Sequence, residues 1–181
     1  MMLAALALAT VAAAAPDLSL GWYGQSGFRP GLRTELQWAL AEGDGRAAHH
    51  ALVGGADAGA WMVPNSLAMG FVGATGGWVR TGEQGLRSEL VLGFGAARLR
   101  SLVPVYTLEA DGMTGAAELE PVSLPGHWRR VASARVGIGW GPTETRRWGV
   151  MVRPTLQVVS AWNGGVALPF AVELAAVRRG G

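Results

Sequence analysis

The sequence predicts an all-β fold, an antiparallel up-and-down transmembrane β-barrel of eight strands. Three observations carry this prediction. Apolar and polar residues alternate with a period of two through most of the chain, Gly supplies 28 of the 181 residues, and charged residues make up only 15%. Soluble domains average about 7% Gly and about 25% charged residues. Because one domain takes about 150 residues, the length predicts a single domain.

The first element is a segment to be removed before the fold is considered. The sequence MMLAALALATVAAAAP is an unbroken apolar run that ends in small residues, with Ala13 and Ala15 placed as in an A-x-A cleavage site. This pattern predicts a secretory signal peptide over residues 1–16, followed by a barrel domain over residues 17–181. The alternative is a buried or membrane-anchoring helix, but the run is shorter than the roughly 20 residues that span a bilayer.

The strands that follow are recognised by alternation. From Leu32 to Leu40, every second residue is apolar or Thr, and Arg33 and Glu35 fall on the opposite face. The segment Gly85–Leu90, GLRSEL, repeats GLRTEL at Gly31–Leu36 with one Thr/Ser exchange. Across the predicted strands taken together, the second face is small, rich in Gly and sparsely charged, which suits a narrow lumen better than a solvated surface.

Compact turn signals separate these strands. They occur at Gly43–Gly45, Thr81–Gln84 and Gly141–Thr143, whereas residues 101–128 form a long and less regular connection. The predicted strands cover residues 18–24, 31–42, 47–62, 67–80, 85–99, 128–140, 147–161 and 166–177. Eight strands place both termini and the compact turns on one side and the long connection on the other, as in bacterial outer-membrane barrels.

Tryptophan gives independent support, because Trp collects where strands meet the membrane-water interface. Seven of the eight Trp residues lie near a predicted strand end: Trp38, Trp61, Trp78, Trp128, Trp140, Trp148 and Trp162. Core filling is the alternative, and Trp61 and Trp78 could face the lumen. A membrane helix over residues 58–79 and a secreted soluble β-sandwich are competing architectures, although Pro and Gly in that segment disfavour the helix.

Charged residues on the inward face predict a filled lumen. Buried charges must be paired, and the interior of an eight-stranded barrel is just wide enough for side chains, so we expect an ion network and no open pore. The predicted lumen network consists of Arg33, Glu35, Arg87, Glu89, Arg135, Arg153, Glu173 and Asp57.

The long connection holds the remaining candidates. Four acidic residues, Glu109, Asp111, Glu118 and Glu120, lie between Leu108 and Leu124 without a basic residue. This acidic loop could bind cations or a basic partner, or could simply be solvated. His127 and Ser123 form a possible catalytic pair, but this spacing has little specificity because catalytic sets are recognised by spatial roles.

Composition excludes several classes of site. The chain has no Cys, which rules out disulfides, thiolate nucleophiles and zinc fingers, and we expect no metal and no cofactor. The formal net charge is only +2, so nucleic acid is not an expected partner.

The sequence resembles the small eight-stranded outer-membrane β-barrel proteins of Gram-negative bacteria. The resemblance is carried by the two GLR(T/S)EL strand starts, by GIGW at 137–140, and by Asn163, Gly165, Leu168 and Phe170, which resemble the signal of a final strand. It departs from that signal because no aromatic residue ends the chain. The resemblance implies location in the outer membrane, with outer-membrane lipids, lipopolysaccharide and the assembly machinery as partners. The function it implies is structural or loop-mediated binding; the alternative is a lipid-modifying barrel enzyme.

Overall fold

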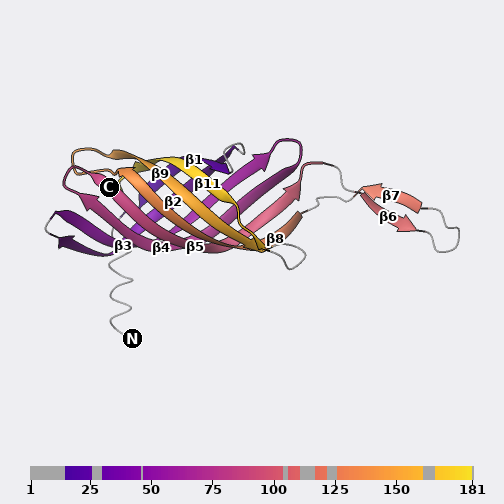
Figure 1. Ribbon diagram of the computed structural model, residues 1–181, viewed down its shortest axis with the longest axis horizontal. Helices are drawn as coiled ribbons and strands as arrows, with labels where there is room; N and C mark the ends of the chain where they lie inside the picture. The colour runs from indigo at the N-terminus through magenta and orange to yellow at the C-terminus, as the bar shows by residue number, and fades with distance from the viewer. Residues whose placement is uncertain are drawn as a thin grey trace, which may run out of the picture.

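Eight long strands close into one antiparallel barrel in the computed structural model (Figure 1). The structure describes residues 15–25, 30–45, 47–103, 106–110, 117–121, 126–160 and 166–180. The barrel strands are β1 (Asp17–Gln25), β2 (Gly31–Gly45), β3 (Ala48–Val63), β4 (Leu67–Gly82), β5 (Leu86–Ser101), β8 (Gly126–Trp140), β9 (Trp148–Ser160) and β11 (Phe170–Arg178). Each of the eight predicted strands is therefore present, within a few residues of its expected bounds.

Pairing of the first and last strands closes the ring. β1 pairs with β2 on one side and with β11 on the other, so that Trp22 is opposite both Leu32 and Leu174. β8 pairs with β9, which joins the two halves of the sheet. A closed ring has no unpaired edge, and the prediction that residues 18–24 form the first strand is confirmed.

The two ends of the barrel differ. One end of the barrel, here called the turn end, carries Asp17, Arg178 and the connections from β2 to β3, β4 to β5 and β8 to β9. The long connection from β5 to β8 leaves from the opposite end, here called the hairpin end. Figure 1 shows a small hairpin projecting far beyond the hairpin end. This arrangement is the one that an even strand count predicts.

The projecting hairpin corrects one expectation. Residues 101–128 were expected to form an irregular connection, but β6 (Tyr106–Ala110) pairs with β7 (Ala117–Pro121) in an antiparallel ladder. Each strand has only five residues, so the alternation of apolar and polar residues repeats too few times to be recognised in this acidic segment. A further short strand, β10 (Val166–Ala167), pairs with β9.

Side chains alternate between the lumen and the outward face along every barrel strand. On β5, Leu92 is 60% exposed and Phe94 is 66% exposed, whereas Val91, the residue before Leu92, is buried. On β9, buried and exposed residues alternate without interruption from Gly149 to Ser160. The outward face is thus apolar and the lumen is polar at its centre, which is the reverse of a soluble sandwich.

Two irregularities shape the wall. The register between β2 and β3 shifts between Ala39 and Ala41, so Leu40 is a bulged residue that leans over Gly54. Beyond the bulge, residues 41–45 are all exposed and lack large apolar side chains, so this part of the β2–β3 hairpin extends past the apolar belt. On β9, the pairing with β8 is interrupted between Val152 and Thr155, where Pro154 has no backbone N–H to donate.

Four of the seven tryptophans follow the prediction. Trp78, Trp128, Trp140 and Trp148 are exposed on the outward face near strand ends. Trp61 is 5% exposed and packs in the lumen beside Tyr23 and Met69, so its placement at the membrane interface is wrong and the core-filling alternative holds there. Trp38 is half-buried, and Trp162 lies outside the described residues.

The helical alternative is also overturned. Residues 58–79 contribute to β3 and β4 and pair with each other through their shared hairpin. Within the part of the chain that the structure describes, no helix is long and apolar enough to cross a membrane.

Candidate functional site

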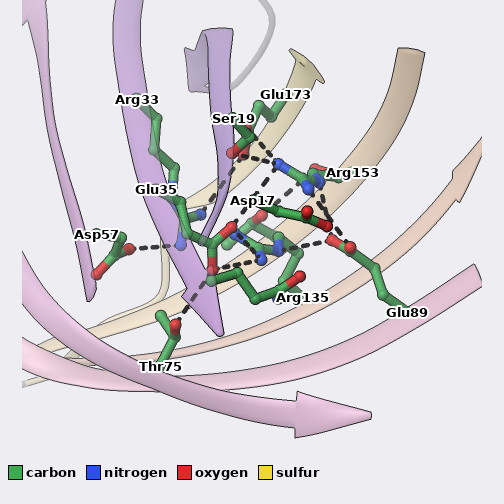
Figure 2. A network of polar contacts seen from close by, with 12 residues as sticks. Asp17, Ser19, Arg33, Glu35, Asp57, Thr75, Glu89, Arg135, Arg153 and Glu173 are labelled. Carbon is green, nitrogen blue, oxygen red and sulfur yellow. Dashed lines mark hydrogen bonds and ion pairs between the residues drawn. The ribbon is translucent and has the colours of Figure 1, made fainter. Parts of the chain in front are cut away.

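All eight residues of the predicted lumen network lie inside the barrel, and each is at most 7% exposed. They come from six strands, and the seven that Figure 2 labels point toward one another inside the barrel. Within this set of eight, four guanidinium groups face four carboxylates, so the formal charges of the set balance. Desolvating eight charges is costly, and the cost is offset only when each group finds partners of opposite charge.

Arg135 on β8 crosses the lumen to Glu35 on β2. Its Nη2 donates to both carboxylate oxygens of Glu35, at 2.8 and 2.7 Å, and its Nε lies 3.2 Å from Oε1 of Glu89. Thr75 also donates to Glu35 Oε1 at 3.1 Å. These contacts tie β2, β4, β5 and β8 together through side chains, in addition to the backbone ladders.

Arg153 on β9 is the most connected cation. Its Nε lies 2.8 Å from Oε1 of Glu89, and its Nη1 lies 3.2 Å from Oε1 of Glu173 and 3.8 Å from Oε2 of Glu35. The same Nη1 donates to the hydroxyl of Ser19 at 3.0 Å. Because Glu89 also forms an ion pair with Arg135, Arg135 and Arg153 and the three glutamates form one continuous cluster.

The other two arginines extend the cluster toward the two ends of the lumen. Arg33 binds Asp57 at 2.5 Å and lies 3.7 Å from Glu173. Arg87 donates to Asp17 at 3.0 Å and to Gln37 at 2.5 Å. Arg33 also lies over the rings of Tyr23 and Phe71, 6.0 and 5.8 Å from their centroids, within the range of cation–π attraction.

Sequence reasoning missed four members of the network: Asp17, Ser19, Gln37 and Thr75. Gln37 continues the inward face two residues after Glu35, so alternation could have found it. Asp17 was assigned only as the first residue after the signal peptide. Ser19 and Thr75 are uncharged, and their sequence neighbourhoods give no sign of a lumen partner.

Glycines on the lumen wall create the space for this network. A Cβ at Gly137 would lie 2.5 Å from Cγ of Glu89, and a Cβ at Gly21 would lie 2.7 Å from Cγ of Glu173. Gly137 is opposite Glu89 in register, and Gly21 is opposite Arg33. The high Gly content is therefore tied to large charged side chains on the neighbouring strands.

Apolar clusters cover the ion network at both ends. Toward the hairpin end, one cluster of buried residues includes Tyr23, Trp61, Met69 and Phe71. Two smaller clusters, around Val79 and around Met151, lie toward the turn end. A void beside Asp57 and Gln157 measures about 10 Å³, the room of about one water molecule.

The candidate catalytic residues are only partly described. His127 is exposed at the start of β8, opposite Leu99 on β5, whereas Ser123 lies outside the described residues. His49 and His50 lie at the turn end. His49 Nδ1 is 2.9 Å from Asp44 Oδ1, and the ring of His50 lies 5.4 Å from that of Trp78.

The backbone pairing of β6 with β7 locates three residues of the acidic loop. Glu109 of β6 is opposite Glu118 of β7 in register, and Glu120 is opposite Thr107. Asp111 lies outside the described residues. Among the residues that the structure describes, no group of three or more His, Asp or Glu side chains is arranged to hold a metal ion.

Comparison with known proteins bears on the fold. No protein-family model matches the chain, and no curated protein matches it. Among solved structures, Neisserial surface protein A matches with a TM-score of 0.54 at 10% identity, over 91% of this chain and 94% of that one. The outer membrane enzyme PagL matches with a TM-score of 0.52 at 10% identity, over 90% of this chain and 99% of that one. The chain has the fold of the small eight-stranded outer-membrane β-barrel proteins.

Proposed function

We propose that this protein is a sealed barrel of the outer membrane that holds a hairpin at the cell surface, with a structural or loop-mediated binding role in the envelope. The observation that carries the proposal is the filled lumen. Buried ion pairs occupy its centre, and apolar clusters cover them on both sides. Such a barrel is a membrane anchor and has no path for solutes.

The outward face supports location in a bilayer. Large apolar side chains such as Leu90, Phe94 and Ile138 are more than half exposed. Exposed apolar surface on this scale is costly in water and is favourable against lipid. Outer-membrane lipids and lipopolysaccharide are the expected surroundings. Delivery there requires the signal peptide of residues 1–16 and the outer-membrane assembly machinery.

Location is tested by fractionation of the envelope with gel electrophoresis of heated and unheated samples. The mature chain should begin near Asp17, sediment with outer membranes and change its mobility on heating, as folded barrels do. Recovery in the cytosol with Met1 intact would contradict both the signal peptide and the membrane location.

The seal is tested by conductance in planar bilayers. The refolded protein should give no steady single-channel current, and an open porin measured in the same bilayers is the positive control. A steady current from the folded, heat-modifiable protein would show that the lumen is not closed.

The projecting hairpin is the proposed binding element, and its acidic residues favour a basic partner. The probe is a polylysine peptide. Weaker binding is expected after Glu109→Gln, Glu118→Gln and Glu120→Gln are combined, with Glu83→Gln at the opposite end as the control. Equal binding by both variants would contradict a role of the hairpin acids.

A lipid-modifying enzyme is the second candidate, because His127 is exposed at the hairpin end of β8. Mass spectrometry of lipid A separates the two functions. An enzyme predicts a changed lipid species that disappears in His127→Ala and Ser123→Ala, whereas a binding protein predicts the same lipid A in all strains.

A further inference from the structure

The outward face of the barrel has a groove near the hairpin end. It is a shallow, open groove that runs across β1 to β5 and reaches Trp128 on β8, with a volume of about 540 Å³ and an almost entirely apolar surface. Small residues form its base, among them Ala58, Ala60 and Gly70, while Leu32 and Trp128 stand on opposite sides. The volume is in the range of about 300–1,000 Å³ that binds a small organic molecule.

Three arginines lie at one side of this groove. Arg98 lines it, and Arg100 follows two residues later on the same outward face of β5. In the register between β5 and β8, Trp128 is opposite Arg98, and Arg130 is opposite Ala96, another residue that lines the groove. Arg98 and Trp128 thus line the groove, and Arg100 and Arg130 lie near them on the outward faces of the same two strands.

These arginines carry charge that the barrel does not neutralise. No ion pair joins any of the three to another residue in the described ranges, in contrast to the four arginines of the lumen. Among the described residues, the outward-facing side chains in the half of the barrel nearer the hairpin end include no Asp or Glu. Guanidinium groups bind phosphate with paired, charge-assisted hydrogen bonds, so a phosphate is the expected counter-charge.

The position fits the boundary of a membrane leaflet. Trp128 is 64% exposed and lies near the end of its strand, at the level where aromatic residues meet lipid headgroups. The groove continues from Arg98 across β4 and β3 to Leu32 on β2. A ligand that fits both parts has a phosphate at one end and a hydrocarbon chain at the other.

We infer that this groove binds one molecule of phosphorylated lipid A, with a phosphate on Arg98, Arg100 and Arg130 and an acyl chain in the channel between Leu32 and Trp128. The inference rests on the proposed location in the outer membrane. Charge complementarity selects a phosphorylated lipid, and the apolar base selects an acyl chain.

The experiment measures lipid A bound to the detergent-purified full-length barrel by native mass spectrometry. The probes are lipid A with its phosphates and lipid A from which they have been removed. We expect the double variant Arg98→Gln with Arg130→Gln to lower the affinity for phosphorylated lipid A at least about tenfold, because two charge-assisted contacts are lost. Removal of the phosphates from the lipid should have a similar effect on the wild type.

Filling the groove tests the acyl chain separately. Ala60→Phe should lower the affinity for both lipids, and Ala60→Val is the milder variant if the first does not fold. The matched controls are Arg80→Gln, an exposed arginine near the turn end of β4, and Ala134→Phe, a small outward residue of β8 outside the groove. Neither control should change the affinity.

Unchanged affinity in the arginine double variant, or equal binding of the two lipids, would overturn the inference. Binding of phosphatidylglycerol with the same dependence on the arginines, and no binding of lipid A, would also overturn it. Outer-membrane location and heat-modifiability are measured on the same samples. If both hold while lipid binding is unselective, the lipid site fails and the proposed barrel function stands.

Discussion

Arg153 has three carboxylates within 4 Å and is 1% exposed, so its loss would leave a buried excess of negative charge. We predict that Arg153→Met lowers the free energy of unfolding by about 3–5 kcal/mol, because the uncompensated charges stay in a dry lumen. Urea titration of protein refolded into lipid vesicles measures this. Arg80→Met, on an exposed arginine of β4, is the control and should cost less than about 1 kcal/mol. Equal costs would show that the lumen is wet enough to screen the charges.

Gly137 and Gly76 form a matched pair for the role of glycine. A Cβ at Gly137 would meet Glu89 at 2.5 Å, and Glu89 cannot move without losing its arginines, whereas the nearest atom to a Cβ at Gly76 is 3.8 Å away. Gly137→Ala should therefore destabilise the barrel by about 1–3 kcal/mol. Gly76→Ala should be neutral or stabilise it by about 0.4–1 kcal/mol, since the unfolded chain loses freedom. The same urea titration decides, and a reversed order would contradict the packing described for Glu89.

His49 lies on the part of the β2–β3 hairpin that extends past the apolar belt. Its hydrogen bond with Asp44 raises the pKa of the imidazole above its ordinary value of about 6.5, and Glu42 acts in the same direction while partial burial opposes it. A raised folded-state pKa means that the contribution to stability is present below about pH 6.5 and is lost as pH rises through the folded-state pKa. NMR titration of the His49 ring should show the raised pKa, and Asp44→Asn should lower it. The same pKa in both proteins would rule out the hydrogen bond as the cause.

At the level of single strands, the inside and outside assignment is open to a direct test. Glu89 and Leu90 are consecutive residues of β5, with exposed fractions of 2% and 52%. Spin labels should be reached by a lipid-soluble quencher at position 90 and by neither lipid-soluble nor water-soluble quenchers at position 89. A lipid-accessible label at position 89 would invert the faces of the strand.

Charge on the lipid side gives the energetic counterpart. Leu90→Arg should cost about 2–4 kcal/mol if the residue lies near the middle of the bilayer, because the guanidinium meets hydrocarbon. Leu86→Arg, nearer the turn end of the same strand, should cost about 0–1 kcal/mol. Unfolding in vesicles measures both, and a larger cost at Leu86 would contradict the position of the apolar belt.

Alternation located all eight barrel strands because each has nine to sixteen residues, enough for several repeats of the pattern. The same signal fails for β6 and β7, which have five residues each. It also cannot reveal a bulge such as Leu40, since one extra residue changes the partner strand's register and leaves the local pattern nearly intact. The predicted position of Trp61 is wrong for a related reason, because nearness to a strand end does not determine which face of the strand a ring occupies.

At the scale of the whole molecule, the alternation of residues along each strand predicted which charged residues lie in the lumen. It could not predict which of them pair with one another. Arg135 and Glu35 are 100 residues apart, and Arg153 and Ser19 are 134 apart. Their contact depends on the stagger between all the strands that separate them around the ring, which no local pattern records. The eight charged residues at the centre of the network were therefore predictable from the sequence, whereas Asp17, the uncharged partners and the pairing were not.

The pairing of β1 with β11 also bears on how the barrel is made. Leu18 lies opposite Arg178, so the ring closes between β1 and β11, which are the first and the last of the eight barrel strands in chain order. Until residues 170–178 arrive, every shorter chain has two unpaired edges and an apolar outward face, both of which favour aggregation in water. The chain therefore stays prone to aggregation until its nine-residue strand β11 pairs with β1.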